Sequence, residues 1–134
     1  MKTTLAGLVV AAGLLLGTGP ALAHHAFSAE FDANKPVNLT GTVTKVEWTN
    51  PHAWFYIDVS DATGKVTNWA FELGGPNTLI REGWTRNSMK PGDIVTVEGS
   101  RAKDGSPIAN AQAVTLKSTG KRLFAASSRG QQQQ

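Results

Sequence analysis

Hydrophobic and polar residues alternate along much of the chain from Val37 onward, with the two-residue period of β-strands. The alternation is clearest in segment 54–60, where Phe55, Ile57 and Val59 share one face. Five segments are predicted as strands on this basis: 37–48, 54–60, 65–73, 94–100 and 108–116.

The first predicted strand changes phase along its length. Leu39 and Val43 lie on one face, whereas Val46 and Trp48 continue with the opposite parity. This slip predicts a β-bulge near residues 44–45, a device by which one long strand bends to serve both sides of a small barrel. Gly41 is expected to allow a close backbone approach at that bend.

The third predicted strand ends at Gly74-Gly75-Pro76, and proline suits the first turn of a helix. Residues 77–82 give about two helical turns before Gly83. Segments 61–64 and 103–106 are predicted hairpin turns. The predicted fold class is therefore mainly all-β: a small five-stranded OB-like barrel with one short helix between strands 3 and 4, and an SH3-like barrel as the alternative.

The first 23 residues have the pattern of an export signal. Lys2 is followed by the apolar run 5–16 and by a small-x-small cleavage site that ends at Ala23. The run is short for a membrane span and no second one follows, so we expect no membrane anchor after cleavage. The expected location is periplasmic or secreted, with His24 as the first mature residue; a cut after Ala21 is the alternative.

Beyond the signal, three regions are predicted. Residues 24–36 form an N-terminal arm, 37–118 form the OB-like β-barrel, and 119–134 form a disordered tail rich in serine, glycine and glutamine. In the arm, Phe27 and Phe31 are four residues apart, which fits one face of a short helix or an irregular arm pinned by two phenylalanines.

The amino-acid composition excludes several kinds of functional site and partner. The chain has no cysteine, which excludes disulfides, thiolate metal sites and cysteine nucleophiles. The formal net charge is +3, one unit of which belongs to Lys2 in the signal, and the positive residues form no block. Because the positive charge is small and dispersed, and because export is predicted, we expect no nucleic-acid partner.

The candidate metal ligands are His24, His25 and His52, the only three histidines of the chain. Cleavage after Ala23 gives His24 a free amine, which can chelate one ion together with Nδ1 of the same residue. The imidazole of His52 then completes a three-nitrogen set that suits Cu(II), and His25 is an alternate ligand. This arrangement resembles the histidine brace of copper carriers and oxygenases. We therefore expect a metal ion as partner, with copper(II) as cofactor.

Three further side chains are candidate additional ligands: Glu30, Asp32 and Met89. The cut after Ala21 also predicts Cu(II) binding, through the amine, two amide nitrogens and the imidazole of His24, without His52.

The alternative function is a metal-free module that binds a small molecule, glycan or protein partner. OB folds bind ligands on the face of strands 2 and 3, and aromatic residues there provide stacking surfaces. The candidate ligand-binding residues are Trp48, Asn50, Trp54, Tyr56, Trp84 and Arg86. The tryptophans have the competing explanation that they fill the core.

No catalytic residue is predicted. The chain lacks a Gly-x-Ser-x-Gly elbow, a phosphate-binding glycine loop and a His-Glu-x-x-His motif. Copper oxygenase chemistry stays open, but a binding protein is expected.

Several motifs also carry a family resemblance. They are HHAF at 24–27, EFD at 30–32, WTNPHAW at 48–54, GWTRNS at 83–88 and KPGD at 90–93. With these motifs, the chain up to about Phe124 resembles a family of short exported bacterial proteins classed as a domain of unknown function. The resemblance implies an exported OB-like β-barrel and supplies no activity.

Overall fold

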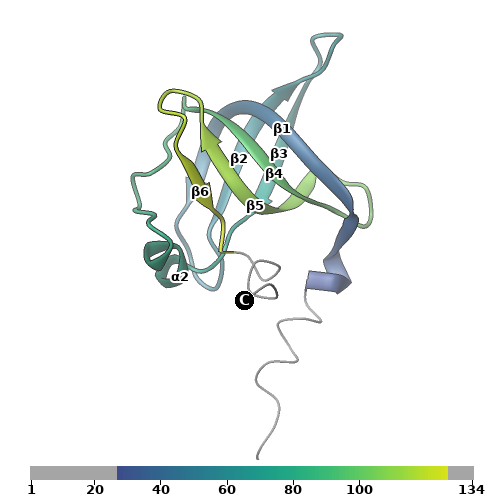
Figure 1. Cartoon of the computed structure of the whole chain (residues 1–134). Coiled ribbons are helices and arrows are strands. Elements are labelled where there is room, and N and C mark those ends of the chain that lie inside the picture. Colours follow the sequence, from purple (N-terminus) through teal and green to yellow (C-terminus); the bar gives the residue numbers. More distant parts are fainter. Residues whose placement is uncertain (1–26, 127–134) are drawn as a thin grey trace, which may run out of the picture.

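A single sheet forms almost the whole of the protein in the computed structural model, which describes residues 27–126 (Figure 1). The elements are β1 (Phe31–Glu47), β2 (Trp54–Ser60), β3 (Val66–Glu72), α2 (Pro76–Arg81), β4 (Ile94–Ala102), β5 (Ile108–Leu116) and β6 (Arg122–Phe124). The strand order is β3-β2-β1-β4-β5-β6. A parallel pairing of β3 with β5, through residues 70–72 and 108–110, closes this sheet into a ring. The predicted mainly-β, OB-like layout, with a helix between β3 and β4, is confirmed.

The bend in β1 lies where the phase slip predicts it. The register of β1 against β2 shifts between Val43 and Lys45, and β1 pairs with β4 along its earlier part. A side chain at Gly41 would collide with the carbonyl oxygen of Asp58. The bulge and the glycine therefore let one long strand belong to both sides of the closed sheet.

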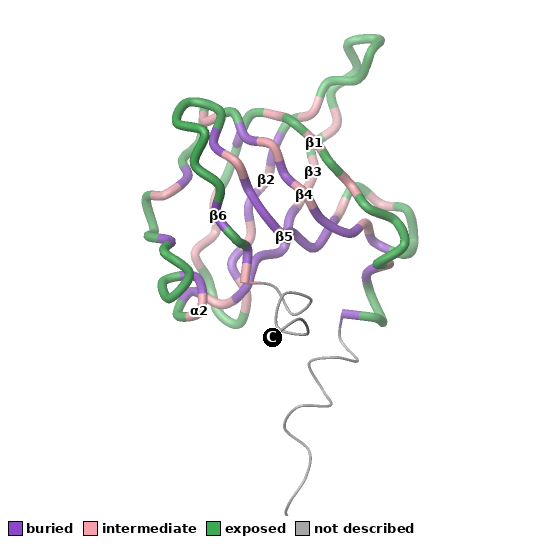
Figure 2. Tube along the Cα trace, in the orientation of Figure 1, coloured by how far each residue is buried: buried purple, intermediate pink, exposed green. Residues whose placement is uncertain are grey.

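The core fills the inside of this ring. Alternate residues of β2 point inward, so Phe55 and Ile57 are fully buried, and Phe55 stacks on Phe71 with ring centroids 5.2 Å apart. Figure 2 shows buried residues mainly along β4 and β5, whereas the turns and much of β1 and β6 are exposed. Burying side chains of this size contributes about 1.5–3 kcal/mol each.

The amino-terminal side of the sheet differs from the prediction. β1 begins at Phe31, inside the segment expected to be an arm, and Phe31 pairs with Ala102 of β4. Residues 27–30 form one helical turn that leads directly into β1. The strand is longer than its alternation suggests because residues 32–36 are polar or small on both faces, which hides the two-residue period.

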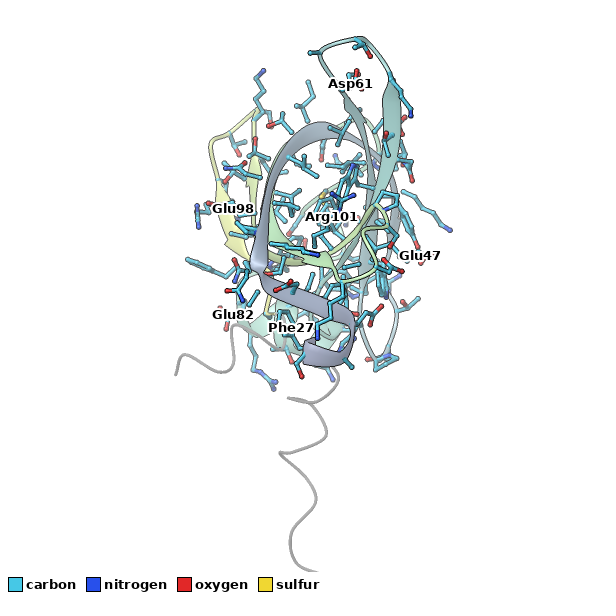
Figure 3. All side chains as sticks on the ribbon, turned by 90° about the vertical axis from the view of Figure 1, so that its right-hand side faces the viewer. Phe27, Glu47, Asp61, Glu82, Glu98 and Arg101 are labelled. Carbon is cyan, nitrogen blue, oxygen red and sulfur yellow. The ribbon has the colours of Figure 1, made fainter. Side chains whose placement is uncertain are left out.

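That helical turn packs on the outside of the closed sheet. Phe27 and Phe31 lie 5.7 Å apart between ring centroids and form a second small apolar cluster with Ala102 and Ile108. The amide of Lys103 donates a hydrogen bond of 2.9 Å to the Glu30 carbonyl. Figure 3 shows the turn with Phe27 at the lower edge of the sheet.

The carboxyl-terminal side also differs. A sixth strand, β6, lies within the segment predicted as a disordered tail, and Leu123 and Ala125 are buried. Gly74 donates a backbone hydrogen bond of 2.8 Å to Ala125, and a side chain at Gly74 would meet the backbone of Ala126. Three residues are too few to show a periodic pattern, so only the packing reveals this strand.

Some predictions fall outside the described residues: the signal at 1–23, His24, His25 and the tail from 127 onward. Within residues 27–126 no helix has the length and apolar character needed to cross a membrane.

Candidate functional site

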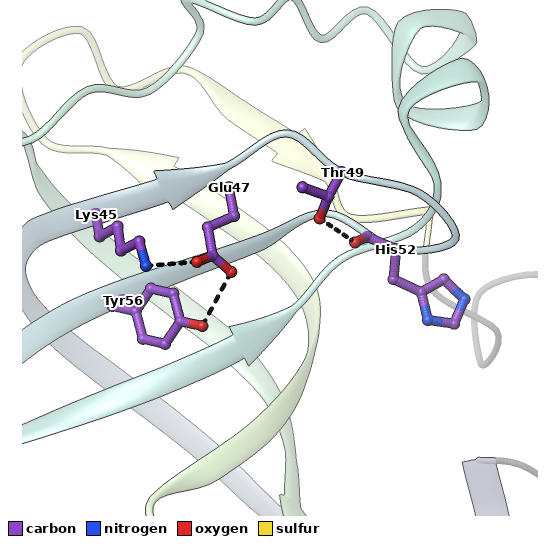
Figure 4. Close-up of polar contacts among 5 residues, drawn as sticks. All are labelled: Lys45, Glu47, Thr49, His52 and Tyr56. Atoms are coloured by element: carbon purple, nitrogen blue, oxygen red, sulfur yellow. Dashed lines mark hydrogen bonds and ion pairs between the residues drawn. The ribbon is translucent and has the colours of Figure 1, made fainter.

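The loop between β1 and β2 carries His52 at one end of the closed sheet. The Asn50–Pro51 peptide bond is cis. The hydroxyl of Thr49 donates a hydrogen bond of 3.0 Å to the carbonyl of His52 (Figure 4). Ala53 then exchanges backbone hydrogen bonds of 3.0 and 2.8 Å with residues 73–74 beyond β3. The backbone of His52 is thus fixed, while 42% of its side chain is exposed.

Glu72, the last residue of β3, lies beside this histidine. Nδ1 of His52 is 3.5 Å from Oε1 of Glu72, just beyond ordinary hydrogen-bond length. The same oxygen accepts a hydrogen bond of 3.1 Å from Nδ2 of Asn110, which is directly opposite Glu72 in the β3–β5 pairing. Glu72 is only 8% exposed and Asn110 is fully buried. A buried carboxylate is therefore held between a buried amide and an exposed imidazole.

Burial raises the pKa of Glu72 above its usual range, because the charged form loses its hydration. The positive charge that His52 can carry opposes this rise, and the hydrogen bond from Asn110 also lowers the pKa. The carboxylate of Glu30 raises the pKa further. Glu30 belongs to the helical turn at residues 27–30, so the amino-terminal segment approaches the same end of the sheet as His52.

The structure brings together only part of the predicted metal set. His52 is on the rim, whereas His24 and His25 lie outside the described residues. Among residues 27–126, no group of three or more histidine, aspartate or glutamate side chains is arranged to hold a metal ion. Met89 is buried in the main core, so the prediction that it is an extra ligand is wrong.

The second strand presents its aromatic residues as the alternation predicts. Trp54 and Tyr56 are half-buried on the outer face, opposite the buried Phe55 and Ile57. The Tyr56 hydroxyl donates a 3.2 Å hydrogen bond to Glu47, and the ammonium group of Lys45 lies 5.5 Å from the ring centroid (Figure 4). The Tyr56 ring thus already has a cation over one face and a carboxylate at its hydroxyl.

The remaining ligand-binding candidates are scattered. Trp84 is 2% exposed, and its indole N–H donates a 2.8 Å hydrogen bond to the carbonyl of Phe124, so its assignment to a binding surface is wrong. Trp48 is half-buried against the main core, whereas Asn50 and Arg86 are exposed in separate loops. Trp84 is buried because β6 covers it, and β6 was not predicted.

Sequence reasoning missed Glu72 and Asn110 as site residues. Glu72 sits on the face of β3 opposite the core residue Phe71. Its burial depends on β5 pairing alongside and on the nearby amino-terminal turn, both of which are distant in sequence. The one available signal was a carboxylate two residues before a glycine pair, which is weak by itself.

Comparison with solved structures finds the mitochondrial single-stranded DNA-binding protein Rim1 from S. cerevisiae. It is 10% identical, with a TM-score of 0.49, and the match covers 62% of this chain and 93% of that chain. A similarity of this size assigns no ligand to the present chain. Because a single-stranded DNA-binding protein is among the similar structures, the exclusion of nucleic acid as a partner is nonetheless overturned. No curated protein matches the chain.

A family match covers the site. The model of the family of unknown function DUF6152 matches residues 11–111, a stretch that includes His52, Glu72 and Asn110 but ends before β6. This confirms the resemblance to a domain of unknown function that the motifs indicate. The chain therefore belongs to the family of unknown function DUF6152.

Proposed function

We propose that the exported, processed protein binds one Cu(II) ion between its first residue and the rim of the closed sheet, and that it carries copper rather than catalysing a reaction. Signal cleavage after Ala23 supplies the ligands of His24, namely its amine and Nδ1. His52 supplies the third nitrogen, and His25 is an alternate ligand.

The observation that carries the proposal is the environment of His52. A metal-binding histidine usually donates its second ring N–H to a carboxylate or carbonyl, which orients the ring. Nδ1 of His52 lies 3.5 Å from the buried carboxylate of Glu72, while 42% of the His52 side chain is exposed. A loop histidine without a function has no need of a buried carboxylate behind it.

The position of the amino-terminal segment gives further support. The helical turn at residues 27–30 packs on the outside of the sheet, and Glu30 is close enough to Glu72 to raise its pKa. Three residues of extended chain span about 10–11 Å. The proposal requires that His24, three residues before Phe27, reach the rim on which His52 lies.

The donor set favours copper over zinc. Three nitrogens in a T-shaped arrangement suit the tetragonal preference of Cu(II), which also has the highest affinity among the common divalent ions. Zinc prefers four tetrahedral ligands. We propose a carrier because a domain of this size has little room for a substrate platform.

The metal-free alternative has less support. A stacking surface needs accessible aromatic faces, but Lys45 lies over Tyr56 and Trp84 is in the core. Only Trp54 remains on the outer face of β2 with no such role, and one half-buried ring is a small surface for a sugar or a base.

The test is a Cu(II) titration of the protein beginning at His24, compared with the same protein acetylated on its α-amine. Acetylation removes one ligand and leaves the side chains intact. We expect a loss of at least tenfold in affinity on acetylation and a comparable loss in His52→Ala. Equal affinity in the native and acetylated forms would overturn the proposal. A loss on acetylation without one in His52→Ala would instead indicate a terminal site that does not use the rim.

A further inference from the structure

Glu72 is a buried carboxylate whose described polar neighbours are Asn110 and His52. It is one of only three buried polar or charged residues among those described, with Ser100 and Asn110. Burying a carboxylate is costly unless it is paired and hydrogen-bonded. Its location beside the only described histidine therefore calls for an explanation beyond stability.

The geometry indicates what Glu72 does to that histidine. A neutral imidazole carries its proton on one nitrogen and a lone pair on the other. Oε1 of Glu72 lies 3.5 Å from Nδ1 of His52, and once Glu72 is ionised this oxygen can only accept a hydrogen bond. The proton is thus favoured on Nδ1, and the lone pair lies on Nε2, across the ring from the sheet.

Asn110 fixes the carboxylate in turn. Its Nδ2 donates a 3.1 Å hydrogen bond to the same Oε1, and it occupies the β5 position directly opposite Glu72. Within residues 27–126, the Oδ1 atom of Asn110 is buried and has no hydrogen-bond partner. The amide N–H of Asn110 thus binds Glu72, although its own side-chain oxygen is left without a partner. We take this as a sign that Asn110 is positioned for the contact with Glu72.

We propose that Glu72, held by Asn110, is a positioning residue for His52 that places the proton on Nδ1 and so presents Nε2 as the ligand atom. The copper consequence rests on the proposed function above, whereas the choice of tautomer does not. Outer carboxylates of this kind typically change metal affinity by roughly 10–100-fold when they are removed.

The first test needs no metal. The ¹⁵N chemical shifts of His52 in the metal-free protein at pH 8, where an ordinary imidazole is neutral, report which nitrogen carries the proton. We expect the Nδ1–H form in the wild type and in Glu72→Gln, whose amide oxygen still accepts a hydrogen bond. Glu72→Leu should move the proton to Nε2. Glu47→Gln is the matched control, because its carboxylate is half-buried on the same face and pairs with Lys45 instead of His52. An unchanged tautomer in Glu72→Leu would overturn the positioning role.

The second test is a Cu(II) titration of the same variants, each beginning at His24. We expect a 10–100-fold loss in Glu72→Leu, a much smaller loss in Glu72→Gln and none in Glu47→Gln. Equal copper affinity in wild type and Glu72→Leu would overturn the inference while leaving the proposed function standing. If the native protein binds copper no better than its acetylated form but the tautomer shifts as expected, the copper function fails and the positioning role holds.

Discussion

At the scale of single residues, Glu72 differs from the other acidic residues in its burial and its pKa. The chain has ten acidic residues, and the others among residues 27–126 are exposed or only half-buried, as in ordinary surface chemistry. Glu47, which is beside Lys45 and the Tyr56 hydroxyl, has its pKa lowered by the hydrogen bond with Lys45. Glu72 has its pKa raised by burial. Two glutamates on one face of the sheet thus have pKa values that are shifted in opposite directions.

This difference predicts a pH dependence of stability. Because the pKa of Glu72 is raised in the folded protein, the folded state keeps its proton at pH values where the unfolded chain, with a carboxyl pKa of 4.5, has released it. The contribution to stability is complete below pH 4.5 and is lost as pH rises through the raised pKa. We expect the free energy of unfolding of Glu72→Gln to increase relative to wild type over this range, as measured by urea denaturation from pH 4.5 to 8.

Glu47→Gln is again the control. Its lowered pKa gives a contribution that is present above pH 4.5 and lost only as pH falls, so its profile should run parallel to wild type in the measured range. Parallel profiles for wild type and Glu72→Gln as well would show that the Glu72 carboxylate is not desolvated in solution.

At the scale of elements, the helical turn at residues 27–30 leads directly into β1. Its attachment depends on Phe27 and Phe31 against Ala102 and Ile108, and on the hydrogen bond from Lys103 to Glu30. This cluster is separate from the main core. The turn can therefore open without global unfolding, since local stability varies across a structure.

Phe27→Ala should loosen this turn selectively. Removing the buried ring costs about 2 kcal/mol of local stability, which should speed hydrogen exchange of the Lys103 amide by roughly 30-fold and weaken Cu(II) binding through lost pre-organisation. Phe124→Ala, at a phenylalanine that is 60% exposed on β6, is the control and should leave both unchanged. If exchange at Lys103 does not respond to Phe27→Ala, the turn is not held by this contact.

At the scale of the whole molecule, copper would bridge the first residue and the β1–β2 loop, and so stabilise the folded state alone. A ligand at 100 times its dissociation constant contributes about 2.7 kcal/mol. For a domain of this size we expect Tm to rise by roughly 10–20 °C with Cu(II), and the shift to disappear in His52→Ala. Thermal unfolding followed by circular dichroism measures both, and the absence of a shift in the native protein would contradict a bridging site.

The sequence by itself determined those features that depend on local periodicity and backbone chemistry. Alternation located β2 and most of β3, β4 and β5, the phase slip located the bulge in β1, and Gly-Gly-Pro located the start of α2. The loop position of His52 also followed from the sequence, since it lies between the predicted strands 37–48 and 54–60. These signals extend over a few residues and need no distant partner.

Only the tertiary structure decided which outward positions became buried. Glu72 and Asn110 meet because β3 and β5 pair in parallel when the sheet closes, and Trp84 becomes a core residue because β6 returns to cover it. These contacts join segments 38 and 40 residues apart. Burial depends on what packs against a residue rather than on the residue itself, so no local pattern could have predicted the carboxylate behind His52.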